Sequence, residues 1–139
     1  MIKKPSSRSI VFLLMISCPF WVYGQDKKAV KHNLKSVTEY EQKFEKGTAG
    51  KTMKESEIRY DKSGNAVEET EYKLGKITRH VTCEYDEDNN KIRETELDPS
   101  GRKVKITEYK YNDGLRIEKA VYNGSHQLIS KKTYKYETH

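Results

Sequence analysis

Residues 36–139 alternate between short segments rich in Thr, Val, Ile and Tyr and tight groups of Gly, Asn and Asp. β-Branched and aromatic residues favour strands over helices, and the turn residues between the segments favour antiparallel hairpins. Eight strands are predicted, one every twelve or thirteen residues, over 37–44, 52–60, 66–72, 77–85, 91–97, 103–111, 115–122 and 127–136. A longer loop is expected at 45–50, where two glycines allow positive φ.

One pattern recurs along these strands with a period of about 25 residues, the size of one supersecondary unit in a repeat protein. Four tyrosines end alternate strands at nearly equal intervals: Tyr60, Tyr85, Tyr111 and Tyr136. Other sets keep the same period: Val67, Ile92 and Ile117; Thr70, Thr95 and Ala120; Tyr72, Leu97 and Tyr122; Gly64, Asn89 and Gly114. Such a fixed period indicates a repeat architecture with one unit per copy.

The apolar residues of each copy do not share one face of a regular strand. Val67 and Tyr72 are separated by an odd number of positions, and an odd offset places two side chains on opposite faces. Either these strands contain β-bulges, or the sheet carries a thin apolar stripe on both faces. Charged residues make up 35% of the chain and apolar ones 34%, so the core must be thin. We therefore favour an all-β, twisted, largely single-layer antiparallel meander over a two-sheet sandwich.

Residues 1–24 have the order of a secretory signal peptide. Lys3, Lys4 and Arg8 precede an apolar run, and small or turn-prone residues follow up to Gly24. The run is too short and too broken to span a bilayer comfortably, so no membrane insertion is expected after cleavage. Export to the periplasm or the cell exterior is the prediction. A lipoprotein signal ending at Cys18 is the alternative, and it would leave the chain lipid-anchored.

Cleavage after Gly24 divides the rest of the chain into a polar, lysine-rich tether over 25–35 and a β-repeat domain over 36–139. The leader holds three basic residues and no acidic one, so the formal net charge falls from +6 to +3. The remaining charges are interspersed, whereas a nucleic-acid binder shows a clustered basic face, so no nucleic-acid partner is expected. Cys83 becomes the single cysteine, which excludes a disulfide within the chain.

Residues that could support chemistry lack the context that each reaction needs. His80 and Cys83 are an odd number of positions apart on a strand, and no further cysteine completes a zinc site. Asp86, Asp88 and Asn90 imitate the start of a calcium loop, but the later ligands are missing. Carboxylates two apart on a strand face, such as Glu69 and Glu71, have solvated charged neighbours rather than a cleft. No catalytic residue, metal or cofactor is predicted.

The tyrosines at the strand ends have two interpretations. Rings on a regular sheet present flat apolar faces, so Tyr60, Tyr85, Tyr111 and Tyr136 could bind a glycan as an aromatic strip. Alternatively, they stack to hold the repeats together, and we favour this structural role.

The repeated turns resemble YD repeats, the Tyr-Asp units of the Rhs family and of many exported bacterial β-proteins. The matching residues are Tyr60-Asp61 with Gly64-Asn65, Tyr85-Asp86 with Asn89-Asn90, and, more weakly, Tyr111-Asn112 with Gly114. The resemblance covers most of the β-repeat domain. It implies a β-repeat fold and export rather than an activity, because three copies are too few to enclose a toxin as large Rhs proteins do.

These observations favour a non-catalytic exported protein that acts through its surface, as a binding or structural module of the cell envelope. An exported enzyme or enzyme inhibitor with a cleft hidden from the sequence is the alternative. The outer strands of an open sheet have unpaired backbone groups. The last strand carries Lys131, Lys132 and Lys135, which discourage pairing between copies of that strand. The first strand has fewer cations to discourage pairing. From the two edges together, we expect a monomer in dilute solution and a partner strand that adds at 37–44, around Val37 and Tyr40.

Overall fold

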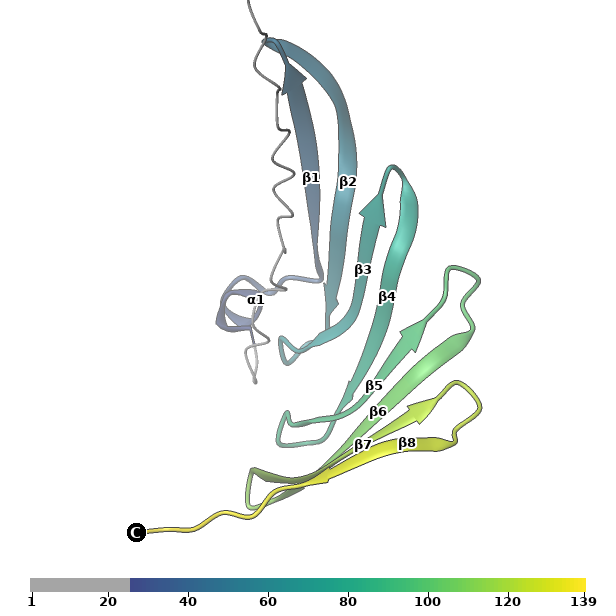
Figure 1. The fold of residues 1–139 in the computed structure, drawn as a ribbon. Coiled ribbons are helices and arrows are strands. Elements are labelled where there is room, and N and C mark those ends of the chain that lie inside the picture. The colour runs from purple at the N-terminus through teal and green to yellow at the C-terminus, as the bar shows by residue number, and fades with distance from the viewer. Residues whose placement is uncertain (1–25) are drawn as a thin grey trace, which may run out of the picture.

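A computed structural model describes residues 26–139, which form one short helix and eight strands (Figure 1). Their bounds are α1 Lys27–His32, β1 Ser36–Glu45, β2 Thr48–Tyr60, β3 Ala66–Lys73, β4 Lys76–Tyr85, β5 Lys91–Leu97, β6 Lys103–Asn112, β7 Leu115–Asn123 and β8 Leu128–Thr133. The predicted signal peptide and Cys18 lie outside the described residues. No helix in the described part of the chain is long and apolar enough to cross a membrane.

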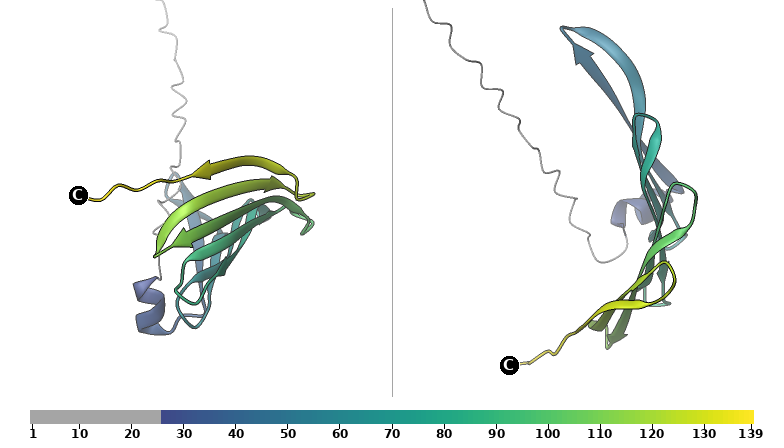
Figure 2. Two further views of the ribbon diagram at one scale, coloured as in Figure 1. Left: turned by 90° about the horizontal axis from the view of Figure 1, so that it is seen from below. Right: turned by 45° about the vertical axis from the view of Figure 1, so that its right-hand side comes forward.

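All eight strands form one antiparallel sheet whose order follows the chain from β1 to β8. The sheet twists and curves along its length without closing into a barrel, so β1 and β8 are its two edges (Figures 1 and 2). The prediction of a single-layer, all-β meander is confirmed. The last strand is shorter than predicted, because pairing with β7 ends near Thr133.

Two kinds of turn join the strands. Two-residue turns with positive φ at both positions occur at Lys46-Gly47, Leu74-Gly75 and Asp113-Gly114, a conformation that matches the twist of the flanking strands. The other four turns begin with an Asp or Asn whose side-chain oxygen accepts the backbone N–H groups two and four residues later: Asp61, Asp86, Asp98 and Asn123. Short polar side chains thus fix the longer turns.

The turns correct two expectations from the sequence. Residues 45–50 are not a loop, because β1 and β2 meet at the two-residue turn Lys46-Gly47 and continue on both sides of it. Gly114 shares the period of Gly64 and Asn89 but belongs to the two-residue kind, so Asn112 ends β6 instead of opening a turn. Two turns can therefore lie one repeat period apart and still differ in type. The type depends on whether an Asp or Asn side chain at the start of the turn accepts the backbone N–H groups that follow it.

Bulges resolve the odd offsets in each copy. Every strand pair from β2 to β8 shifts register once, close to the turn that precedes the second strand. In the β4–β5 pair, Glu84 faces Arg93 and Tyr85 faces Lys91, which leaves Ile92 as the extra residue. The equivalent extra residues are Val67, Thr78, Val104, Ile117 and Ile129. Bulges increase the local twist, so their repetition accounts for the curvature of the sheet.

The core is a thin line of small side chains along the middle of the sheet. Thr70, Thr95 and Ala120, which share the repeat period, are buried at 8%, 6% and 4% exposure. The other buried positions of the sheet are Val81, Cys83, Ile106 and Thr107. Since no second layer covers either face over residues 26–139, the long Lys, Arg and Glu side chains beside these positions shield them, with their charged ends in water.

Helix α1 occupies part of the segment that the sequence analysis assigned to a tether. Asp26 caps it by accepting the N–H groups of Lys28 and Ala29, and these bonds lower the pKa of the Asp26 carboxyl. The helix is docked on the β2–β3 turn, where the Asp26 N–H donates to the Gly64 carbonyl at 3.0 Å (Figure 2). Ala29 is 2% exposed. A six-residue helix is marginal alone, so this contact stabilises it.

Candidate binding surface

The four periodic tyrosines have structural hydrogen bonds. The hydroxyl of Tyr85 donates to the Ala66 carbonyl at 3.0 Å, that of Tyr111 to Lys91 at 3.0 Å, and that of Tyr136 to Arg116 at 2.7 Å. Each acceptor lies at the start of the preceding strand. Tyr60 has no earlier copy to contact, and its hydroxyl instead donates to Asp26 beside α1 at 3.1 Å. The tyrosines therefore link neighbouring elements through hydroxyl-to-backbone and hydroxyl-to-carboxylate bonds.

Three of these tyrosines are half-buried, and Tyr136 is 50% exposed. Burial raises the pKa of both Tyr60 and Tyr85, and for Tyr60 the bond to Asp26 adds to this effect. The phenols of Tyr60 and Tyr85 are therefore protonated donors at neutral pH. Their rings do not form the fully open strip that stacking on a glycan requires. The contacts favour a structural role through the hydroxyl groups rather than through the predicted ring stacking.

Removing one of these hydroxyls is expected to weaken the sheet. Tyr85→Phe keeps the ring and leaves the Ala66 carbonyl without its donor, so the free energy of unfolding should fall by about 1 kcal/mol. Urea denaturation followed by far-UV circular dichroism measures this. Tyr40→Phe is the control, because Tyr40 is 62% exposed and should tolerate the change. Equal stability of Tyr85→Phe and the wild type would contradict a structural role for the hydroxyl.

Charged side chains form a second periodic feature, which the sequence analysis did not identify. Glu68, Arg93 and Glu118 are one repeat period apart on β3, β5 and β7, and each pairs with one side chain on either neighbouring strand. Glu68 contacts Arg59 and His80, Arg93 contacts Glu84 and Glu108, and Glu118 contacts Lys110 and Lys131. Hydrogen bonds from Lys131 and Lys110 lower the pKa of Glu118. The sign of the central charge alternates, which could have been read from the period of the sequence.

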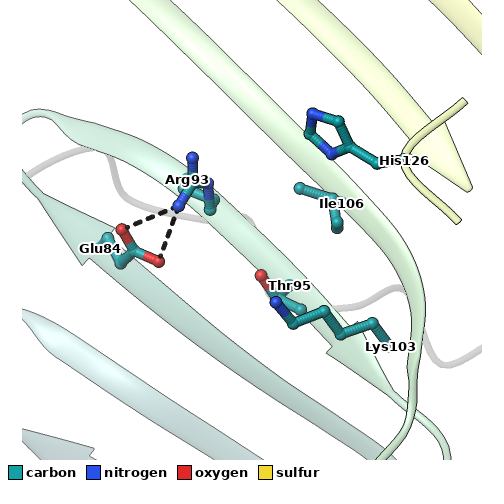
Figure 3. Close-up of a pocket in the computed structure, with 6 residues that line it drawn as sticks. All are labelled: Glu84, Arg93, Thr95, Lys103, Ile106 and His126. Atoms are coloured by element: carbon teal, nitrogen blue, oxygen red, sulfur yellow. Dashed lines mark hydrogen bonds and ion pairs between the residues drawn. The ribbon is translucent and has the colours of Figure 1, made fainter. Parts of the chain in front are cut away.

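Two shallow hollows lie at equivalent positions of successive repeats. The larger, about 250 Å³, is lined by Glu84, Arg93, Thr95, Lys103, Ile106 and His126 (Figure 3). The smaller, about 150 Å³, includes Arg59, Glu68 and Thr70, which precede Glu84, Arg93 and Thr95 by one repeat. In the larger hollow Arg93 neutralises Glu84, and the His126 ring stacks on Tyr122 at 4.5 Å. Arg93 and His126 thus contact neighbouring side chains and do not converge on a common point in the hollow.

The residues considered for metals are engaged in local contacts. His80 lies 2.8 Å from Glu68, while Cys83 is buried, and burial raises the pKa of its thiol. Asp86 accepts the N–H groups of Asp88 and Asn90, so its carboxylate stabilises its own turn. In the described range, no three His, Cys, Asp or Glu side chains are grouped as a metal site would need.

The first hairpin projects beyond the rest of the sheet. Strand β2 pairs with β3 only from residue 56 to residue 60, so residues 48–55 have β1 as their single neighbour in the sheet. Figure 1 shows this part of β1 and β2 extending past the end of β3. We call residues 40–55 the projecting arm. On it, Tyr40 and Phe44 are 62% and 63% exposed, and Val37 just before it is 42% exposed.

The outer edge of β1 has a defined hydrogen-bonding pattern. The Tyr60 N–H donates to the Lys35 carbonyl, and residues of antiparallel strands alternate in the direction of their backbone groups. By this alternation the backbone of Val37 faces β2, whereas Thr38 and Tyr40 face outward. The predicted edge strand is therefore present, but the backbone N–H and C=O groups of Val37 point toward β2 and not toward the open edge. The two register shifts with β2 do not change the pattern, because both place their extra residues on β2.

The two edges of the sheet differ in charge. Strand β1 carries Glu39, Glu41 and Glu45 against Lys43, and Lys43 lies 3.2 Å from Glu41. Loss of solvation and then the nearby Glu41 raise the pKa of Glu55 on the adjacent strand β2. Strand β8 carries Lys131 and Lys132 and no acidic residue, and Lys135 follows it.

The edge strand over residues 37–44 was predicted correctly, but the arm is longer than expected, because β1 and β2 continue through residues 45–50, where a loop was predicted. The repeated Tyr-Asp turns remain a resemblance to YD repeats, and function must be inferred from the surface described above. No protein-family model matches the sequence, and no curated protein matches it either.

Proposed function

We propose that this chain is a non-catalytic, exported binding module of the cell envelope, and that its projecting arm binds an extended segment of an envelope protein. The segment would add to the outer edge of β1 as a further strand. Export is inferred from the signal-peptide order of residues 1–24, and the absence of a motif for catalysis from the sequence.

The observation that supports this proposal is the projecting arm. Its distal part has one strand neighbour where the other strands of the interior have two, and isolated two-stranded hairpins are marginally stable in water. It nevertheless carries Tyr40 and Phe44 more than half exposed. Strand addition would satisfy the outward backbone groups of β1 and cover these rings, with backbone bonds giving affinity and side chains giving specificity.

Proline substitution at outward-facing positions tests the proposal. Thr38→Pro combined with Tyr40→Pro removes two outward N–H donors and leaves the bonds to β2, so capture of partners from an envelope extract should be lost. Val37→Pro would be unsuitable, because its N–H faces β2. The matched control is Thr133→Pro on β8, whose N–H also faces outward because the adjacent Tyr134 N–H donates to Ile117.

The outcomes separate the edge from the side chains and from the sheet faces. Loss of capture in the β1 prolines but not in Thr133→Pro supports strand addition, provided that circular dichroism shows an intact sheet. Loss in Tyr40→Ala as well would identify the ring as a specificity contact. Unchanged capture by the β1 proline variant would overturn the proposal and direct attention to the tyrosine-bearing face, including binding of a glycan there.

A further inference from the structure

The two edge strands have complementary features that the proposed function does not use. Strand β1 is acidic and β8 is basic, and both edges are open in the described residues. Each also exposes apolar side chains: Phe44 and Ile129 are both 63% exposed. We infer that β8 of one molecule pairs with β1 of a second copy, so that the chain assembles head to tail when its local concentration is high.

The strand order allows this pairing without a break in the sheet. Neighbouring strands alternate in direction from β1 to β8, so an odd strand placed beside β8 continues the antiparallel pattern. A second copy that contributes β1 therefore extends the meander from eight strands to the next eight. The interface is heterologous, joining two different surfaces, and such contacts form open chains unless a rotation closes them into a ring.

The backbone pattern limits the two edges to registers that place outward-facing residues opposite one another. The Tyr134 N–H donates to Ile117, so by alternation Lys131 and Thr133 face outward from β8. On β1 the outward residues include Tyr40 and Gln42. Pairing Thr133 with Tyr40 of the second copy then pairs Lys131 with Gln42, and it places Lys132 opposite Glu41.

Side chains support the same register. Lys132 and Glu41 form a non-hydrogen-bonded pair in it, the kind in which cross-strand side chains approach most closely. Continuing the count along both strands places Ile129 level with Phe44. Lys131 already pairs with Glu118 within its own molecule, at 2.6 Å, so Lys132 is the cation of β8 that this register brings to the second copy.

Charge also disfavours the symmetric alternatives. Two β8 strands would place lysines against lysines, and like charges across a strand pair are destabilising. Two β1 strands would bring together edges that each carry three glutamates and one lysine. The mixed pairing is the one that joins edges of opposite net charge. Attraction between exposed charges is screened by salt, so assembly should weaken as ionic strength rises. A weak, salt-sensitive contact of this kind agrees with the prediction of a monomer in dilute solution, with assembly expected only at high concentration.

Reciprocal charge reversals test this pairing with the mature chain, residues 25–139. Sedimentation velocity at low ionic strength should show the wild type growing in mass with concentration. Lys132→Glu and Glu41→Lys alone should each weaken self-association by about tenfold, because each creates a like-charge contact at the edge. An equimolar mixture of the two variants should recover assembly as chains in which the variants alternate, since positions 132 and 41 carry opposite charges in both mixed interfaces. The double variant should assemble like the wild type.

The inference shares the β1 edge with the proposed function, and the variants distinguish the two. Lys132→Glu leaves β1 intact, so its self-association should weaken while it still captures an envelope partner. A wild type that stays monomeric at the highest soluble concentration and low salt would overturn the head-to-tail assembly, as would single variants that associate as strongly as the wild type. Loss of partner capture in the β1 proline variant supports the proposed function. The head-to-tail assembly is decided by sedimentation velocity alone.

Discussion

Replacing Gly124 with alanine is expected to destabilise the C-terminal hairpin by about 2 kcal/mol or more, which is within the range for overpacking at a close contact. A Cβ atom at this position would lie 2.1 Å from the Lys103 carbonyl oxygen and 3.0 Å from its carbon. Both are backbone atoms, so no side-chain rotation relieves the contact. The β7–β8 turn must move away from the start of β6, or β6 must shift.

Thermal and urea unfolding followed by circular dichroism measure this loss, and amide exchange locates it. Faster exchange should be confined first to residues of β7 and β8. Gly114→Ala is the control, because Gly114 has a positive φ of 75° but a Cβ atom there would meet nothing within 4 Å beyond its own chain neighbours. The control should show only the cost of a left-handed alanine, roughly 1 kcal/mol. An equal effect of the two substitutions would contradict the close contact with Lys103.

Replacing Gly64 with alanine is expected to release α1 from the sheet. Gly64 has a φ of 80°, and a Cβ atom there would lie 2.4 Å from a methyl group of Val30 and 3.3 Å from the Asp26 carbonyl oxygen. The substitution therefore adds a clash with the helix to the cost of the left-handed conformation. The total loss in the free energy of unfolding should be about 2 kcal/mol.

Amide exchange of Asp26 reports the docking of α1 directly, because its N–H bonds to Gly64, whereas exchange of Leu34 reports the helix itself, because its N–H bonds to Ala29. Both should lose protection in Gly64→Ala and keep it in Gly114→Ala. Val30→Ala in the Gly64→Ala background removes the nearest clashing atom and should restore part of the protection. If α1 stays protected in Gly64→Ala, the helix is not held by the contact described here.

Local chemistry explains how much of the fold could be predicted from the sequence. The eight strands follow from β-branched and aromatic residues separated by turn residues, since the strand ends depend on side chains within a few positions. The same is true of Asp61 and Asp86, whose carboxylates accept N–H groups in their own turns. By contrast, the shared period of Gly64 and Gly114 suggested equivalent turns, and the turns differ because Asn112 remains in β6.

The candidate surface was predictable only in part, because its shape depends on distant segments. The acidic β1 edge could be read from the sequence, but the arm exists because β3 stops short of residues 48–55. Helix α1 was missed because lysine-rich residues 25–35 have little apolar character. It forms where Gly64, far along the chain, leaves room for Val30 and offers a carbonyl to Asp26.

By itself, the sequence determined an antiparallel β-meander with a regular repeat period, its tight turns and the opposite charges of its outer strands. These features depend on intrinsic strand preference, on residues that accept left-handed or capped conformations, and on charges in consecutive positions. Only the tertiary structure decided that bulges resolve the odd offsets, that the tyrosine hydroxyls bind the preceding strand, and that the first hairpin projects. The physical reason is that each of these depends on the register between strands, which brings together backbone groups far apart in the chain.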